Sequence, residues 1–151
     1  MTEINEDIEE FVKFKIGEQE FCIEMSATRE LRSWVPTTAI PNSNPNIIGI
    51  INLREKILPI VNLAARIGLP LATQNNRQVV IVVQSNGNQF GLLVDAVSDI
   101  ISASPSEIHP VPKLTPKGNE ELFKQVIVQG NDIVCQIILD RLLPEMEENA
   151  A

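Results

Sequence analysis

The stretch that decides the fold is GIINLREKILPIVNL, residues 49–63. Apolar and mostly β-branched side chains fill residues 47–53 and 57–61, and the charged residues Arg54, Glu55 and Lys56 separate the two runs. Runs of this kind between polar turns are typical of β-strands, so we predict a strand on each side of the charged turn. Because proline has no N–H to donate to a neighbouring strand, we expect the strand with Pro59 to lie at a sheet edge or to be bulged there.

Towards the N-terminus, the pattern predicts a β-hairpin. In residues 11–16, Val12, Phe14 and Ile16 alternate with lysines, which is the period of two expected from a half-buried strand. The pattern continues after Gly17-Glu18 with Phe21 and Ile23.

Towards the C-terminus, two turns predict further hairpins. Asn86-Gly87 separates residues 79–83 from 90–94, and Gly130-Asn131 separates 126–128 from 133–139. Both dipeptides accept the positive φ angles of tight hairpin turns. The uninterrupted apolar run 79–83 should be covered on both faces of its sheet. Many short antiparallel strands indicate an all-β sandwich or barrel with short helices.

Helical signals are short. We predict helices over residues 25–33, with Ser26 as a cap, over 62–67, which Gly68 ends, and over 140–146, which Pro144 interrupts. Residues 36–45, 69–76 and 105–118 are rich in proline and small polar residues and are predicted to be loops.

Composition indicates a folded, acidic protein. The hydrophobic share of 44% fits a packed core, and 151 residues suffice for one domain or for two small lobes. The net charge of −8 and the low aromatic content oppose nucleic-acid and anionic membrane partners. Acidic residues gather in 1–10 and 144–151, which we interpret as solvated tails. No apolar run is long enough to span a bilayer and no leader is visible, so we expect a cytoplasmic protein without direct membrane insertion.

Residues that carry chemistry are scarce. The one histidine, His109, precedes a proline in a loop, and Asp95 and Asp99 are better explained as turn and cap residues than as paired catalytic acids. Cys22 and Cys135 stand in apolar stretches without metal spacing, so we interpret both as reduced core thiols. No nucleotide-binding or nucleophile motif occurs. We predict a protein that is not an enzyme and needs no cofactor or metal.

Arg54 stands out on physical grounds, because a guanidinium at the end of an apolar strand either reaches solvent or is held by an acid. A weak surface ion pair and an interaction hub are both consistent with its position.

Several segments together resemble the CheW family. Residues 49–63 are similar to its signature, in which an Asn-Leu-Arg-Gly turn leads into an apolar strand with an internal proline and then Asp-Leu. Residues 14–23 look like its opening hairpin, 28–32 like its short helix, 91–100 like its Gly, Val-Asp, Val pattern, and 108–112 like its proline-bearing loop. The resemblance runs from about residue 11 to residue 143. Two positions depart from the pattern, since Glu55 replaces the usual glycine and Asn62 the usual aspartate.

The resemblance implies two packed, five-stranded SH3-like barrels, with intertwined lobes over roughly 14–74 and 75–143. It implies a non-catalytic adaptor that couples chemoreceptors to a CheA-type histidine kinase. One barrel would bind the kinase regulatory domain, and a groove between the barrels would take the helical hairpin tip of a receptor. Carried over by position, the groove residues are Thr28, Glu30, Leu31, Gly49, Arg54, Gly91, Val97 and Ile100.

Within this groove, we hypothesise that Glu30 and Arg54 form an ion pair between the short helix and the turn. The alternatives are a small β-barrel enzyme, which would need His109 or the two aspartates in a deep polar pocket, and an unrelated protein-binding barrel.

Overall fold

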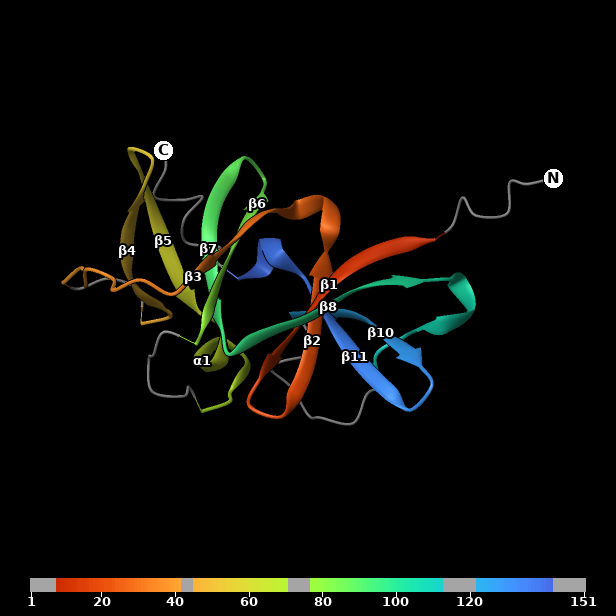
Figure 1. Ribbon diagram of the computed structural model, residues 1–151. Coiled ribbons are helices and arrows are strands. Elements are labelled where there is room, and N and C mark those ends of the chain that lie inside the picture. The colour runs from red at the N-terminus through yellow and green to blue at the C-terminus, as the bar shows by residue number, and fades with distance from the viewer. Residues whose placement is uncertain (1–7, 42–44, 71–76, 113–121, 143–151) are drawn as a thin grey trace.

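Nearly all the regular structure is β-strand. The computed structural model describes residues 8–41, 45–70, 77–112 and 122–142 (Figure 1). The helix α1 (Leu63–Ile67) and the 3₁₀ turns η2 (Met25–Ala27), η3 (Pro105–Glu107) and η5 (Leu139–Arg141) are short. The strands are β1 (Glu9–Ile16), β2 (Gln19–Glu24), β3 (Thr28–Ser33), β4 (Ile47–Leu53), β5 (Lys56–Asn62), β6 (Val79–Ser85), β7 (Asn88–Val94), β8 (Ala96–Ala103), β9 (Ile108–His109), β10 (Phe123–Gln129) and β11 (Asp132–Ile137).

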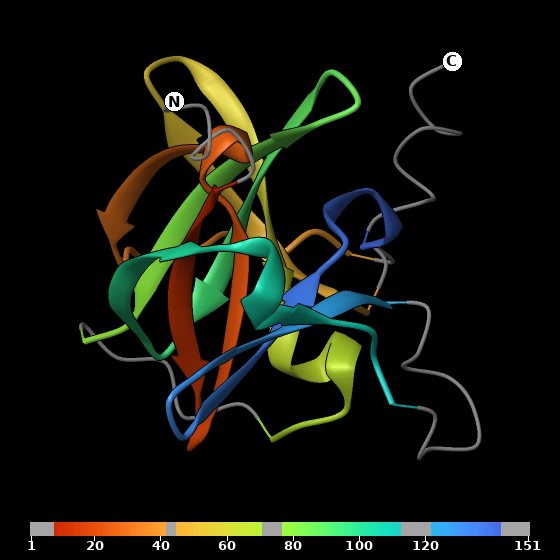
Figure 2. The ribbon, with the colours of Figure 1, turned by 90° about the vertical axis from the view of Figure 1, so that its right-hand side faces the viewer.

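Two sheets form from strands that are far apart in the sequence. The six-stranded sheet has the order β8-β1-β2-β11-β10-β9, and the five-stranded sheet has the order β3-β6-β7-β5-β4. The N-terminal β1–β2 hairpin and the C-terminal β10–β11 hairpin therefore share one sheet (Figures 1 and 2). The all-β class with short helices is confirmed, with one strand more than expected because the two-residue β9 joins the six-stranded sheet. Both sheets draw on residues 14–74 and 75–143, and the boundary between two lobes stays a prediction.

Each sheet curves so that its distant strands meet. In the five-stranded sheet, the chain beyond β3 crosses to β4, where Thr38 and Ile50 exchange two backbone hydrogen bonds of 2.9 Å. In the six-stranded sheet, Gln129 Nε2 on β10 donates to the carbonyl oxygen of Ser102 on β8 at 2.7 Å. Contacts of this kind reduce the number of exposed backbone groups at the edges, as in a small barrel.

Buried apolar side chains of the described residues form three clusters. The largest lies between the sheets and includes Phe14 and Phe21 from one sheet and Ile81 and Leu92 from the other. The cluster inside the five-stranded sheet includes Val80, and the third, inside the six-stranded sheet, includes residues of β1, β2 and β8. Successive residues of β6 face the shared cluster and the inner cluster in turn, which confirms that the run 79–83 is covered on both faces.

The predicted hairpin turns are confirmed. Two-residue loops connect β1 to β2, β6 to β7 and β10 to β11, and positive φ angles occur at Gly17, Asn86, Gly87 and Gly130. Residues with little side-chain hindrance at these positions match the twist of the paired strands.

The helix predicted over residues 25–33 is wrong. Only Met25–Ala27 form a 3₁₀ turn, and Thr28–Ser33 form β3, which pairs with β6. The backbone of the buried strand β6 needs a hydrogen-bonding neighbour on each side, and this requirement outweighs a weak helical propensity. Ser26 does not cap a helix with its side chain.

The other two helix predictions have different outcomes. The predicted helix over 62–67 is confirmed as α1, because Asn62 Oδ1 accepts a hydrogen bond from the Ala65 N–H at 3.1 Å and Gly68 ends the helix in the left-handed conformation. The amide oxygen of Asn62 thus supplies the cap that an aspartate would supply. Of the helix predicted over 140–146, the start lies in η5, and residues 143–146 lie outside the described residues.

Pro59 is neither at a sheet edge nor at a bulge, which corrects the prediction. Its strand, β5, lies between β4 and β7, and the bulge of this hairpin falls between Ile47 and Gly49. The ladder to β7 begins only at Ile60. Pro59 is opposite Ile50, whose own backbone groups bond to Thr38, so its missing N–H removes no ladder hydrogen bond.

Candidate functional site

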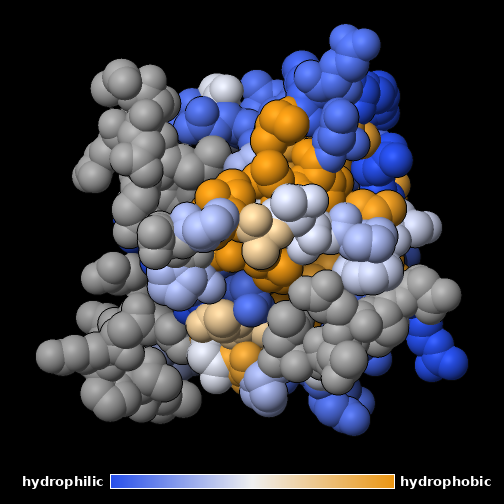
Figure 3. All heavy atoms as spheres, turned by 90° about the vertical axis from the view of Figure 1, so that its left-hand side faces the viewer, coloured by the Kyte–Doolittle hydropathy of each residue, from blue (hydrophilic) through white to orange (hydrophobic). Residues whose placement is uncertain are grey.

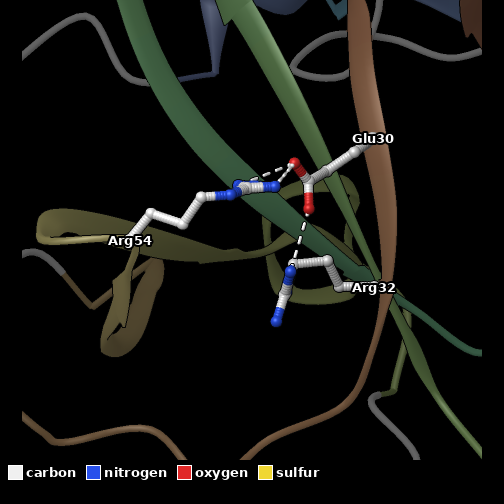
Figure 4. A network of polar contacts seen from close by, with 3 residues as sticks. All are labelled: Glu30, Arg32 and Arg54. Carbon is white, nitrogen blue, oxygen red and sulfur yellow. Dashed lines mark hydrogen bonds and ion pairs between the residues drawn. The ribbon is translucent and has the colours of Figure 1, made fainter.

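Glu30 holds two arginines, and one of them is Arg54. Arg54 donates from Nη2 and Nη1 to Glu30 Oε1 at 2.6 and 3.1 Å, and Arg32 Nη1 donates to Glu30 Oε2 at 3.0 Å (Figure 4). The predicted ion pair is therefore confirmed, although Glu30 lies on a strand and not on a helix. Arg32 was missed, because residues two apart share a face only on a strand.

The ion pair connects the two edges of the five-stranded sheet. Glu30 lies on β3 and Arg54 follows β4, the strands at opposite ends of the sheet order. The side chains are 28% and 65% exposed, respectively. Water screens such a pair, so it contributes under about 1 kcal/mol to folding. The contact therefore stabilises the sheet little, but it holds the guanidinium of Arg54 in a defined position beside β3.

A strained turn directs Arg54 towards β3. Arg54 and Glu55 form the two-residue loop between the paired residues Leu53 and Lys56, and both have positive φ, +51° and +71°. These angles are those of a type I′ turn, which glycine and asparagine favour. Asn52 Oδ1 accepts a hydrogen bond from the Glu55 N–H at 3.1 Å and supports the turn.

Two more predicted groove residues lie on β3. The hydroxyl of Thr28 donates to the carbonyl oxygen of Glu24 at 3.1 Å, so it stabilises the turn that precedes the strand. Leu31 is 46% exposed. Since neighbours on a strand point to opposite faces, Leu31 lies on the face away from Glu30.

The two predicted glycines allow strands to approach closely. A Cβ on Gly49 would lie 2.6 Å from the Thr38 carbonyl oxygen, and a Cβ on Gly91 would lie 2.7 Å from Val80 Cγ1 and 2.8 Å from Ile60 Cδ1. Gly49 therefore permits the backbone crossing that joins the sheet edges, and Gly91 faces the inner apolar cluster. A direct contact of either glycine with a partner stays a prediction.

Val97 and Ile100 lie on β8, the edge strand of the six-stranded sheet. Val97 is half-buried against the shared cluster, whereas Ile100 is 52% exposed. The structure thus brings Glu30 and Arg54 into contact and places Val97 and Ile100 on the other sheet. A single groove that contains all eight residues stays a prediction.

Apolar atoms are also exposed at the end of the molecule where β4 and β5 lie. Figure 3 shows that they gather there in one area, with hydrophilic residues along its upper and right border. Ile57 on β5 is 63% exposed, and Ile40, in the segment between β3 and β4, is 42% exposed. Exposed apolar groups with a polar surround are typical of protein-binding surfaces.

The residues that the sequence analysis considered as catalytic form bonds that support the fold. Asp95 Oδ2 accepts from the Gly17 N–H at 2.7 Å, and its Oδ1 accepts from Gln78 Nε2 at 3.1 Å, so it links the β1–β2 turn to the start of β6. Asp99 accepts from the N–H of the next residue at 2.8 Å. His109 is exposed, and its backbone pairs with β10. Within the ranges that the structure describes, no group of three or more His, Cys, Asp or Glu residues is arranged to hold a metal.

Both cysteines are free thiols, as predicted. Burial raises the pKa of Cys22 to about 12, and the neighbouring Cys135 adds to this effect. Burial also raises the pKa of Cys135. Because the thiolate is the reactive form, neither side chain has the character of a nucleophile at neutral pH.

A cavity of about 300 Å³ lies where the two sheets meet. An ion pair of Lys124 and Glu24, 3.7 Å apart, is at its wall, and none of the eight predicted groove residues lines it. Its charged wall groups are Glu24, Lys124 and Asp140, and it is lined neither by His109 nor by Asp95 and Asp99. It does not have the composition that a small β-barrel enzyme would need.

Comparison with known proteins agrees with this architecture. The probable chemotaxis protein CheW of Rhizobium etli is 39% identical over 148 residues, which cover 98% of this chain and 96% of that protein. The chemotaxis protein CheW of Rhizobium meliloti is 39% identical over 142 residues, with 94% and 92% covered. The crystal structure of the scaffolding protein TtCheW from Thermoanaerobacter tengcongensis superposes with a TM-score of 0.79 at 28% identity, over 87% of this chain and 84% of that one.

Two further findings bear on the class of protein. Among the described residues, none of the helices has the length and apolar character that crossing a membrane requires. The family model of the CheW-like domain matches residues 10–146, and this chain therefore belongs to the CheW family.

Proposed function

We propose that this protein is a non-catalytic adaptor that couples chemoreceptors to a CheA-type histidine kinase. The observation that carries the proposal is the match of the CheW-like domain to residues 10–146. The relatives with 39% identity are named chemotaxis proteins, and the solved relative is named a scaffolding protein. The exposed apolar side chains on both sheets and the scarcity of reactive groups support binding in place of catalysis.

The receptor is the first partner in this proposal. The cytoplasmic tip of a methyl-accepting receptor, a helical hairpin, docks over the edge strand β3, so that it meets Glu30 and Arg54 on one face and the exposed Leu31 on the other. It also reaches the exposed Ile100 on the other sheet. Thr28 and Val97 complete the contact, while Gly49 and Gly91 shape the strands beneath it. The ion pair suits this role, because it is open to solvent and contributes little to folding.

The kinase is the second partner. Its regulatory domain, itself related to CheW, binds one barrel of the adaptor, so that receptor and kinase are held in a fixed relative position in the cytoplasm. A small shift of the receptor then changes the population of active kinase, because it binds the two kinase states with different affinity. No cofactor and no bond-making step is required.

The Arg54→Glu variant tests the receptor contact. The substitution places two carboxylates together at the position of the present ion pair, so we expect receptor-tip binding to weaken by about tenfold or more, which corresponds to about 1.4 kcal/mol. The free energy of unfolding should fall by less than about 1 kcal/mol. Titration calorimetry with a recombinant receptor tip and with the kinase regulatory domain measures both affinities, and the latter should not change.

Two further variants sharpen this test. Arg66→Glu makes the same change in net charge on α1 and should leave receptor binding intact. The exchange of Glu30→Arg together with Arg54→Glu restores an opposite-charge pair and should recover part of the lost affinity. Normal receptor binding by Arg54→Glu would remove this residue from the contact. Wild-type protein that binds neither receptor tip nor kinase domain would refute the adaptor function itself.

A further inference from the structure

The backbone at Glu55 favours glycine, yet a long charged side chain is present. Its φ of +71° lies in the left-handed region, which L-residues with a Cβ adopt at a cost. The support that the turn receives from Asn52 uses the backbone N–H of Glu55 and not its carboxylate. The side chain of Glu55 therefore makes the turn less favourable, and its carboxylate forms no hydrogen bond or ion pair with the residues that the structure describes.

The Glu55 carboxylate is free within the described part of the chain. It is exposed and has no hydrogen bond or ion pair there, whereas Glu24 and Glu30 are each paired with a basic side chain. The nearest cation along the chain on its N-terminal side, Arg54, is already engaged by Glu30. The carboxylate thus remains available to a partner at the outer end of the turn, next to the exposed Lys56.

The surroundings of Glu55 have the composition of an interface rim. Ile57, two residues further along on β5, is 63% exposed. Apolar atoms gather at the end of the molecule where β4 and β5 lie (Figure 3). In protein interfaces, charged groups surround an apolar centre. Charges at such a rim affect the association rate and the choice of partner more than they affect the total affinity.

Resting on the receptor docking proposed above, we infer that Glu55 is a specificity-determining residue. Its carboxylate selects receptor tips that present a lysine or arginine to the Arg54-Glu55 turn. A tip with an acidic residue at that point is rejected, because two unpaired carboxylates would face each other. Arg54 supplies the contact common to all tips, and Glu55 discriminates among them.

Three variants separate this role from a structural one. Glu55→Gln removes the charge but keeps the shape, and Glu55→Gly also relieves the strained turn. Glu18→Gln removes the same charge from an exposed position in the β1–β2 turn and is the matched control. Each variant is titrated with a recombinant receptor tip of the same organism, at low salt and at about 0.5 M salt. The midpoint temperature of thermal unfolding is measured for each variant as well.

We expect Glu55→Gln and Glu55→Gly to bind the tip about three- to fivefold more weakly at low salt, and as well as wild type at high salt. Glu55→Gly should melt about 2 °C higher than wild type, so that it is more stable and yet binds less well. Glu18→Gln should bind normally. Glu55→Lys should bind poorly until one basic residue of the tip is changed to glutamate.

The outcomes distinguish the inference from the function on which it rests. If wild type binds the tip and Glu55→Gln binds equally well at low salt, the inference is wrong and the adaptor function stands. If Glu55→Lys is rescued by none of the charge-reversed tips, the inference is also wrong. If wild type binds no receptor tip, both are wrong.

Discussion

Gly91 offers a sharp test of how the five-stranded sheet is packed. In Gly91→Ala, the new Cβ would lie 2.7 Å from Val80 Cγ1 and 2.8 Å from Ile60 Cδ1. Carbon atoms pack best about 3.5–4.0 Å apart, so each contact is too short by about 1 Å. Val80 and Ile60 are 1% and 0% exposed, so neither can move aside into solvent. We expect the overpacked variant to lose about 2 kcal/mol of unfolding free energy.

Urea unfolding followed by circular dichroism measures this loss, and a double-mutant cycle identifies its cause. Val80→Ala removes the Cγ1 atom that the new Cβ would meet, at the cost of a cavity. If the clash is the reason for the loss, Gly91→Ala should cost at least about 1 kcal/mol less in the Val80→Ala background than in wild type. A variant as stable as wild type, or strictly additive costs, would refute the packing argument.

Two further predictions concern the two aspartates and the buried thiol of Cys22. Asp95→Asn removes the charge from the group that accepts from Gly17 and Gln78 and replaces one acceptor oxygen by an N–H₂ group, so it should cost about 1–2 kcal/mol in urea unfolding. Asp99→Asn should cost under about 0.5 kcal/mol, and equal effects would contradict the linking role of Asp95. The folded-state pKa of Cys22, about 12, exceeds the ordinary 9.0, so its contribution to stability is present below pH 9 and is lost as the pH rises towards 12. Cys22→Ala should therefore lose less stability than wild type over that interval, and equal losses would contradict this.

The hairpins were predictable because their signals are local. Gly17, Asn86-Gly87 and Gly130-Asn131 each stand between two apolar runs, and positive φ at such positions depends on neighbouring residues alone. The contact of Glu30 with Arg54 followed from the family resemblance and not from spacing. Its geometry needs the edges of a sheet to meet, which no short stretch of sequence encodes.

The errors arose where tertiary pairing decides the structure. Residues 28–33 are compatible with a helix on propensity, but the neighbouring β6 makes them a strand. For Pro59, the prediction of an edge or bulged strand was wrong. A proline is tolerated in this central strand because the ladder to β7 begins only at Ile60, which the sequence alone does not reveal. Strand β8 was not predicted as a unit, because Ser98 and Asp99 interrupt its apolar pattern and only its pairing with β1 identifies it.

The interleaved order of the strands constrains how the chain is made. All strands of the five-stranded sheet lie between residues 28 and 94 and can pair as soon as that segment has left the ribosome. The β1–β2 hairpin emerges first, yet its neighbours β8 and β11 are synthesised far later. Both edges of the hairpin must remain unpaired until those strands appear, so the nascent chain exposes backbone groups that pair readily with other strands and that chaperones would have to shield.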